Sequence, residues 1–168
     1  MSGNSSLFDP LSSPTLFNNP SVKIQDECVA AVNELRSRRD ADKPRFVIFK
    51  ISDDERHVVV EEVSPEADYE LFLTRLSSAA DRKGKPAPRY AAYDVEYDLG
   101  DEGKRVSTIF IAWVPAGTSI KNVKSRMLYA STKEQLHKAL NIGVSVHADD
   151  LDDIEWHSVV KRVSRGRA

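Results

Sequence analysis

The residues that could carry out chemistry are few in this sequence, and their spacing suits neither catalysis nor metal binding. The 168-residue chain has four histidines, and no two lie at the i, i+3 or i, i+4 spacing of metal ligands on a helix: His57, His137, His147 and His157. The single cysteine, Cys28, lies within an apolar helical pattern, which favours a buried thiol over a nucleophile. We therefore expect no metal, no cofactor and no covalent reaction.

Two stretches resemble functional motifs without matching them. LGDEGKR, residues 99–105, places two glycines before a lysine but lacks the GxxxxGK[ST] spacing of a phosphate-binding loop, so a hairpin turn explains it better. The acidic run 149–153 lacks the ligand spacing and the glycine of a calcium-binding EF-hand, which indicates a solvated loop before a helix. No GxSxG is present. The sequence therefore gives no support to an enzyme.

The distribution of charge is more informative. With 24 basic and 26 acidic side chains the formal net charge is −2, which argues against a broadly basic nucleic-acid binder. The basic residues nevertheless gather in local clusters: Lys104 and Arg105; Lys121, Lys124 and Arg126; Lys133 and Lys138; Lys161, Arg162 and Arg165. Each cluster fits either an ordinary solvated face or a surface for a protein or a phosphoinositide.

The length fits one domain with a sizeable core. Residues 1–20 hold three of the eight prolines, many Ser and Asn and almost no charge, so we expect a flexible N-terminal extension before a single domain at 21–168. The single cysteine fits cytosolic or nuclear residence. We expect no secretory signal and no membrane span, because the longest apolar stretch, near IFIAWVPA, is too short to cross a bilayer.

Apolar spacing predicts the elements that must position the basic clusters. Residues from Ile24 to Leu35 repeat at three and four residues, as in an amphipathic helix. Arg45–Ile51 and His57–Val63 are predicted strands of one hairpin. A second helix follows Pro65 and carries on one face the apolar side chains of Tyr69, Phe72, Leu73 and Leu76.

The next segments predict two further strands and two helices. Arg89–Asp98 and Lys104–Val114 are the strands, and the second is apolar enough to be central and buried on both faces. A capping box predicts a separate helix from Ser131 to Leu140. Before it we expect a helix over 119–129, whose inner face would carry Ile120, Val123, Met127 and Leu128.

A strand at Val144–Ala148 and a helix over 155–165 complete the predicted order. This order contains neither an internal repeat nor a regular alternation of strand and helix. It predicts an α/β (α+β) fold with one central mixed sheet of five to six strands, sandwiched by helices on both faces.

An ordered set of segments gives the sequence a family resemblance. The segments are YAAYDVEYD, EGKR, an apolar strand ending in W-x-P, VKSRMLYASTKEQLHKAL and VVKRVSRG. Together they resemble the actin-depolymerising factor (ADF)/cofilin family from about Val22 to Gly166, and fungal cofilins most. The resemblance implies a single ADF-homology domain with a five- or six-stranded mixed sheet between helices.

The resemblance also implies a function. Family members bind actin monomers and the sides of filaments, prefer the ADP form, twist the filament, and promote severing and subunit loss without a covalent reaction. We therefore expect an actin-binding monomer in the cytoplasm, the cytoskeleton and the nucleus, with phosphatidylinositol bisphosphate as a competing ligand and no nucleic-acid partner. The alternative is a module that binds actin monomers with little severing activity.

Site residues carry over from the family by position. The surface for both monomers and filaments would comprise Ser21, Val22, Lys23, Lys124, Arg126, Met127, Leu128, Lys133, Glu134, His137 and Lys138. The surface used only on filaments would comprise Lys104, Arg105, Lys161, Arg162 and Arg165. Phosphoinositides would bind through Lys124, Arg126, Lys133 and Lys138.

The chain departs from the family pattern at several places. Pro20 occupies the position of a serine that can be phosphorylated in relatives, which argues against inhibition by phosphorylation there. Val106 and Ser107 stand where some relatives carry another base, which would weaken filament binding. The connector 116–122 and the loop 82–88 are longer than usual.

Overall fold

The computed structural model describes the backbone of residues 22–37, 43–118 and 123–168, and the side chains of all of these except 123–126. Its centre is one six-stranded sheet in the order β1-β3-β2-β4-β5-β6. Both outer strands run parallel to their neighbours and the inner pairs are antiparallel, so the predicted mixed sheet is confirmed. The strands are β1 Lys23–Ile24, β2 Phe46–Ile51, β3 His57–Ser64, β4 Arg89–Asp98, β5 Lys104–Trp113 and β6 Val144–Ala148.

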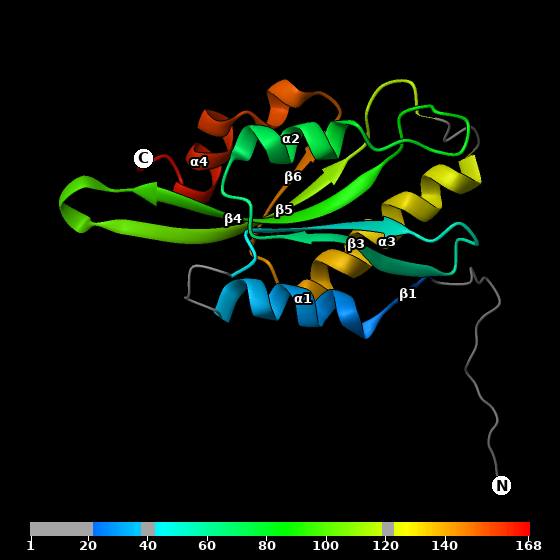
Figure 1. The fold of residues 1–168 in the computed structure, drawn as a ribbon, viewed down its shortest axis with the longest axis horizontal. Coiled ribbons are helices and arrows are strands. Elements are labelled where there is room, and N and C mark those ends of the chain that lie inside the picture. The colour runs from blue at the N-terminus through cyan, green and yellow to red at the C-terminus, as the bar shows by residue number, and fades with distance from the viewer. Residues whose placement is uncertain (1–21, 38–42, 119–122) are drawn as a thin grey trace, which may run out of the picture.

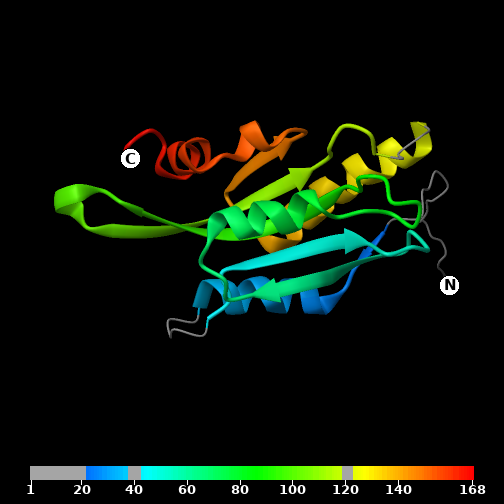
Figure 2. The ribbon, with the colours of Figure 1, turned by 45° about the horizontal axis from the view of Figure 1, so that its top comes forward.

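Helices cover both faces of the sheet, as the element order predicts. In Figures 1 and 2, α2 and α4 lie over one face, whereas α1 and α3 lie over the other. Short 3₁₀ turns, η2 Gly100–Glu102 and η3 Leu151–Ile154, join neighbouring elements. The helices are α1 Asp26–Ser37, α2 Tyr69–Ser77, α3 Val123–Leu140 and α4 Trp156–Ser164. The predicted extension at 1–20 lies outside the described residues.

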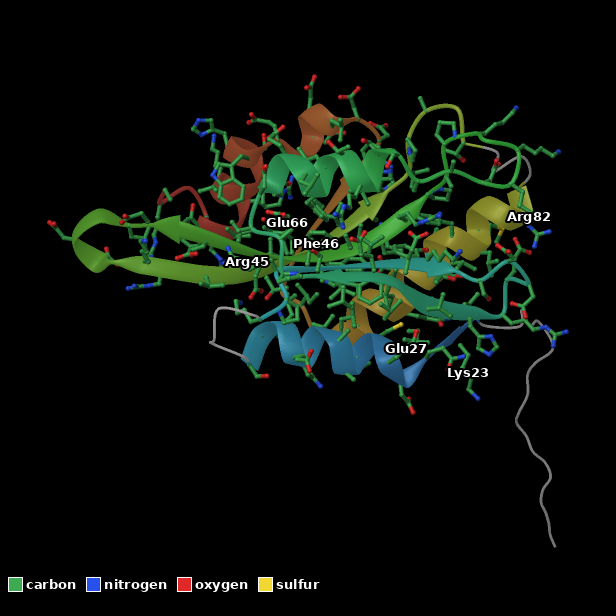
Figure 3. All side chains as sticks on the ribbon, in the orientation of Figure 1. Lys23, Glu27, Arg45, Phe46, Glu66 and Arg82 are labelled. Carbon is green, nitrogen blue, oxygen red and sulfur yellow. The ribbon has the colours of Figure 1, made fainter. Side chains whose placement is uncertain are left out.

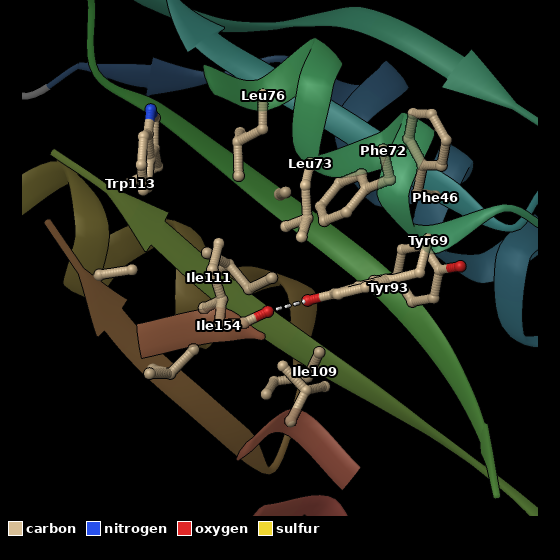
Figure 4. Close-up of a cluster of buried hydrophobic side chains, with 14 of the residues drawn as sticks. Phe46, Tyr69, Phe72, Leu73, Leu76, Tyr93, Ile109, Ile111, Trp113 and Ile154 are labelled. Atoms are coloured by element: carbon tan, nitrogen blue, oxygen red, sulfur yellow. Dashed lines mark hydrogen bonds between the residues drawn. The ribbon is translucent and has the colours of Figure 1, made fainter. Parts of the chain in front are cut away.

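Each face of the sheet has its own apolar cluster. Because side chains alternate along a strand, Ala91 and Tyr93 of β4 face α2 and α4, whereas Tyr90 faces α1 and α3. Figure 4 shows the first cluster, in which the hydroxyl of Tyr69 donates a 2.6 Å hydrogen bond to the carbonyl of Ile154. This bond ties α2 to η3, the turn that leads into α4.

Cys28 is a buried thiol, as predicted. Its side chain is fully buried, and Sγ lies 3.4 Å from the carbonyl oxygen of Val58, to which it donates. Burial, reinforced by the negative charge of Glu27, raises the pKa of the Cys28 thiol to about 12. The thiol therefore stays protonated at neutral pH and contributes to packing between α1 and β3.

The prediction of a separate helix from Ser131 is wrong, because α3 is continuous from Val123 to Leu140. Ser131 does not cap a helix start; its hydroxyl donates to the carbonyl of Leu128 at 3.2 Å, one turn back. The helix continues because one buried stripe runs through the supposed junction and packs on the sheet, formed by Tyr129, Thr132, Leu136 and Leu140.

The prediction that Met127 faces inward is also wrong. Its side chain is 65% exposed, and the neighbouring Leu128 is only partly buried. Among the described side chains of α3 the buried stripe begins at Tyr129, so Met127 falls on the outer face of the helix. Ile120 and the side chain of Val123 lie outside what the structure describes. An apolar residue on a helix is therefore available to a partner.

Candidate binding surfaces

The middle of α3 is fixed to the sheet by two stacked tyrosines. The rings of Tyr90 and Tyr129 lie almost parallel, with centroids 4.6 Å apart. The Tyr90 hydroxyl donates to the carbonyl of Tyr129 at 2.8 Å. The Tyr129 hydroxyl shares its proton between the carbonyls of Arg89 and Trp113, at 3.0 and 3.2 Å. Burial raises the pKa of both phenols well above the usual range, so both remain donors.

The carboxyl end of α3 is held by α1. The Arg36 guanidinium donates to the carbonyls of Leu140 and Asn141, at 3.3 and 2.7 Å, and so satisfies carbonyls left free at a helix end. His137 turns inward, and its ring stacks on Phe110 with centroids 5.2 Å apart. Together with the tyrosine pair, these contacts preorganise α3.

His137 contributes little exposed surface. Its Nε2 atom lies 2.6 Å from the carbonyl oxygen of Ile142, and because a carbonyl can only accept, Nε2 carries the proton. The His137 ring therefore contacts Phe110 on one face and the carbonyl of Ile142 along one edge. Among the site residues expected on α3, His137 is the one that the structure ties most closely to the core.

The outer face of α3 carries several of the other expected residues. Met127, Glu134 and Lys138 are exposed and, at i, i+7 and i+11, fall on one stripe of the helix. Lys133 is partly buried at the side of this stripe, and its Nζ lies 3.9 Å from Glu134. Lys124 and Arg126 belong to α3, and their side chains lie outside the described ones. We name the exposed face of α3, taken together with Lys23 of β1, the α3 surface.

Of the two described residues in the expected N-terminal segment, Lys23 offers its side chain to the solvent and Val22 does not. Val22 is 3% exposed and packs in the cluster under α1 and α3, so its side chain is part of the core. Lys23 is exposed on β1, where its backbone N–H donates to the carbonyl of Arg56 at 2.8 Å. Ser21 lies outside the described residues.

The β4–β5 hairpin projects beyond the helices that cover the sheet (Figure 1). Lys104 pairs with Asp98 and Arg105 pairs with Tyr97, and directly opposed residues share a face. Tyr97 packs on the cluster under α2 and α4, so Arg105 lies on that side and Lys104 on the other. These neighbours in sequence therefore belong to opposite faces of the hairpin.

The outer side of α4 is cationic. Val159 and Val163 are buried, which directs the other side of the helix to solvent and exposes Lys161, Arg162 and Arg165. Glu155 caps the start of α4, because its carboxylate accepts from the N–H of Ser158 at 3.1 Å, and Arg165 caps the end in the left-handed conformation.

The hairpin and α4 form one region. Nη1 of Arg167, just after α4, lies 3.9 Å from the carboxylate of Glu102 at the hairpin tip. Arg105 Nη1 donates to the carbonyl of Glu102 at 2.6 Å, so its guanidinium turns toward the same tip. We name Arg105 and the three cations of α4 the α4–hairpin surface. It lies across the sheet from the α3 surface.

Two exposed apolar residues near this surface were missed by the sequence reasoning as site residues. Val106, 56% exposed, follows Arg105 on β5, and Trp156, 37% exposed, begins α4. Trp156 lines a shallow pocket of about 300 Å³ together with Tyr97 and Lys104, so Lys104, although it leaves β5 on the other face, also borders the side that carries α4. A tryptophan within the polar run EWHS was the signal that could have revealed this pocket.

The described residues contain neither a metal cluster nor a membrane-spanning helix. Nowhere among them do three or more His, Cys, Asp or Glu side chains gather as a metal site would require. Within the same residues, no helix combines the length and the apolar character needed to cross a membrane.

The six-stranded sheet between paired helices, with a long anchored α3, defines an ADF-homology domain. The chain belongs to the cofilin/ADF family: residues 21–164 match the family described as cofilin/tropomyosin-type actin-binding protein. The cofilin of Gibberella zeae is 37% identical over 151 residues, which are 86% of this chain and 95% of that protein. The cofilin of Saccharomyces cerevisiae is 35% identical over 147 residues, covering 86% and 94% of the two chains.

Solved structures agree with this assignment. The crystal structure of Streptomyces griseoflavus cofilin superposes with a TM-score of 0.71 at 31% identity, covering 87% of this chain and 99% of that one. Coactosin from Entamoeba histolytica gives a TM-score of 0.69 over 88% and 98% of the two chains. At 20% identity, that likeness concerns the fold alone.

Proposed function

We propose that this chain binds both monomeric and filamentous actin and promotes filament severing and depolymerisation without catalysing a covalent reaction. The observation that supports this proposal best is the presence of two exposed cationic surfaces on opposite sides of one sheet. A molecule with two such surfaces can contact two neighbouring subunits of a polymer at once. Membership of an actin-binding family supplies the partner.

The α3 surface is the proposed contact with monomers and filaments. Exposed Met127 would provide the apolar anchor at its centre, where desolvation gives the largest share of binding energy. Actin is acidic, so Lys23, Lys133 and Lys138, with Lys124 and Arg126 as predicted from the family, would steer the encounter and set its orientation. His137 and Val22, which the fold holds inward, would act by shaping the surface from below.

The α4–hairpin surface is the proposed filament contact, with Lys104 on the far face of the hairpin as a peripheral group. A protein that bridges two subunits stabilises the filament twist for which it has higher affinity. Boundaries between the altered and the bare filament would then be strained and break. We propose the same preference for ADP-bound subunits as in the family.

A monomer-binding module with little severing is the second candidate. The hairpin favours it, because Lys104 lies across the strand from Arg105 and exposed Val106 replaces a base found in some relatives. The first effect reduces the positive charge that the α4 side of the hairpin offers to a filament, and the second reduces the charge of the opposite face, which Val106 shares with Lys104. The two candidates make the same prediction for monomers and different ones for filaments.

Sedimentation with actin filaments, combined with fluorescence microscopy of single filaments, separates the two candidates. Pelleting with filaments and a rising number of breaks per filament length supports the first. Binding to monomers without pelleting supports the second. If the full chain binds neither monomers nor filaments, both candidates are rejected.

Lipid binding and location follow from the same proposal. We propose that phosphatidylinositol bisphosphate competes with actin for Lys124, Arg126, Lys133 and Lys138, because its clustered phosphates attract the same cations. The protein would act as a monomer in the cytoplasm and cytoskeleton, and in the nucleus where actin is present.

A further inference from the structure

A larger cleft, of about 730 Å³, lies away from the α4–hairpin surface. It forms where the end of β2, the loop between α2 and β4, and the inner side of α3 meet. Figure 3 labels Arg82 at this end of the sheet. The cleft residues that matter to the argument are Lys50, Asp53, Asp81, Arg82, Lys83 and Arg89.

The loop that forms one wall is closed by its own backbone. The Asp81 carboxylate accepts from the N–H groups of Lys83 and Lys85, at 2.8 and 3.0 Å. The N–H of Asp81 donates to the carbonyl of Lys85 at 2.9 Å, and Gly84 supplies the positive φ of +80° that the turn requires. The loop that the sequence shows to be longer than usual is thus an ordered turn that presents Lys83.

The cleft contains cations without strong partners. In the described part of the chain, the ammonium groups of Lys50 and Lys83 take part in neither an ion pair nor a hydrogen bond. Arg82 pairs with Asp53 at 2.9 Å, but these side chains are 85% and 69% exposed, so the pair is weak and exchangeable.

Arg89 lines the cleft, but its charge is already paired with the Glu61 carboxylate. Its Nε and Nη2 donate to the Glu61 carboxylate at 2.7 and 3.2 Å, and its Nη1 donates to the carbonyl of Pro88 at 2.9 Å. Three cations on two structural elements, Lys50 on β2 and Arg82 with Lys83 on the loop, therefore remain for a ligand.

We propose that this cleft binds a compact anion that carries clustered phosphate groups. Ammonium and guanidinium groups form their strongest hydrogen bonds with such anions. The volume lies within the range of roughly 300–1,000 Å³ typical of small-ligand sites. The described lining includes neither Lys133 nor Lys138 of the residues proposed above for phosphoinositides, and the proposal does not depend on actin binding. The phosphates could belong to a free polyphosphate or to a lipid headgroup.

The test uses the full chain and two probes. Inorganic tripolyphosphate is titrated by calorimetry, and phosphatidylcholine vesicles with and without phosphatidylinositol bisphosphate are tested by sedimentation. The variant Lys50→Gln with Lys83→Gln removes both unpaired cations. Two controls remove other exposed cations outside the cleft lining: Lys85→Gln, in the same loop, and Arg56→Gln, in the turn between β2 and β3. Thermal unfolding checks that every variant is folded.

We expect the cleft variant to bind tripolyphosphate at least about tenfold more weakly than the wild type, because it loses two charge-assisted contacts. Both controls should stay near the wild-type affinity. Vesicle binding that needs the bisphosphate lipid and falls in the same variant would assign the phosphates to a headgroup. The proposal is overturned if neither probe binds, if tripolyphosphate binding survives in the cleft variant, or if Lys85→Gln weakens that binding equally.

Discussion

The two proposed actin surfaces are supported in opposite ways. The α3 surface rests on a helix held by the Tyr90–Tyr129 pair in its middle and by Arg36 at its end. The α4–hairpin surface includes a hairpin that projects past the layers, and its tip is joined to the chain after α4 by one exposed ion pair, between Glu102 and Arg167. The difference suggests a stiff platform for one subunit and a more compliant arm for the next.

The root of the hairpin is a buried ionic contact. Asp94 on β4 is 2% exposed and accepts hydrogen bonds from Lys43 Nζ at 2.7 Å and from the Thr108 hydroxyl at 2.6 Å. Lys43 Nζ also donates to the carbonyl of Leu35 at 3.3 Å. This single carboxylate therefore joins the end of α1 to both strands of the hairpin.

Removing the Asp94 carboxylate should have the largest effect on the difference between the two surfaces. Asp94→Ala leaves the Lys43 ammonium without its ionic partner, so we expect a loss of about 3–5 kcal/mol in the free energy of unfolding. Urea denaturation followed by circular dichroism measures it. Glu96→Ala, an exposed acid on the same strand, is the matched control and should change stability by about 0.5 kcal/mol or less. Similar losses in both variants would contradict the proposed role of Asp94.

The stiff platform can be tested at its apolar anchor. Met127→Glu adds a negative charge to the exposed centre of the α3 surface without touching the core. We expect about 2–4 kcal/mol weaker binding to both monomers and filaments, the cost typical of a lost hot spot. Fluorescence titration of labelled monomers and filament pelleting measure the two affinities.

Val63→Glu is the control for Met127, because Val63 is also an exposed apolar side chain, at 43%, and lies outside both proposed surfaces. It should leave both affinities unchanged. If Met127→Glu weakens only filament binding, α3 is not the surface shared by monomers and filaments.

Substitutions on the α4–hairpin surface should weaken binding to filaments and not to monomers. Arg162→Ala with Arg165→Ala removes two exposed charges from α4. We expect filament binding to weaken by about 2 kcal/mol, and monomer binding to remain, because only the filament presents a second subunit to this side. Arg56→Ala with Lys85→Ala makes the same change in net charge at other exposed positions and should leave pelleting intact. Equal losses for monomers and filaments would reject the assignment of two surfaces.

Much of the fold was predictable because the apolar pattern is strong. Strand alternation and the buried run of β5 predicted the sheet, and the apolar stripes of α1 and α2 predicted helices that cover it. The junction within α3 failed because Ser131-Thr132-Lys133-Glu134 satisfies a local capping rule, while the stripe from Tyr129 to Leu140 packs on the sheet and overrides it.

The candidate site was less predictable, because exposure depends on the register of each element against its neighbours. Met127 follows a helical apolar period, yet it lies outside the stripe that the sheet covers. Val22 and His137 are named as contacts by family position, but the fold turns both inward. Lys104 and Arg105 were grouped by charge, and the strand places them on opposite faces.

The placement of Lys104 and Arg105 on opposite faces of the hairpin gives the prediction with the smallest expected effect. Arg105 shares its face with α4, so Arg105→Ala should weaken filament binding by about 0.5–1 kcal/mol, the value of one exposed charge pair. Lys104→Ala removes the same charge from the opposite face and should cost less. Pelleting at low and high salt measures both, and the Arg105 effect should shrink as salt screens it. A larger loss for Lys104→Ala would mean that the filament contacts the other face of the hairpin.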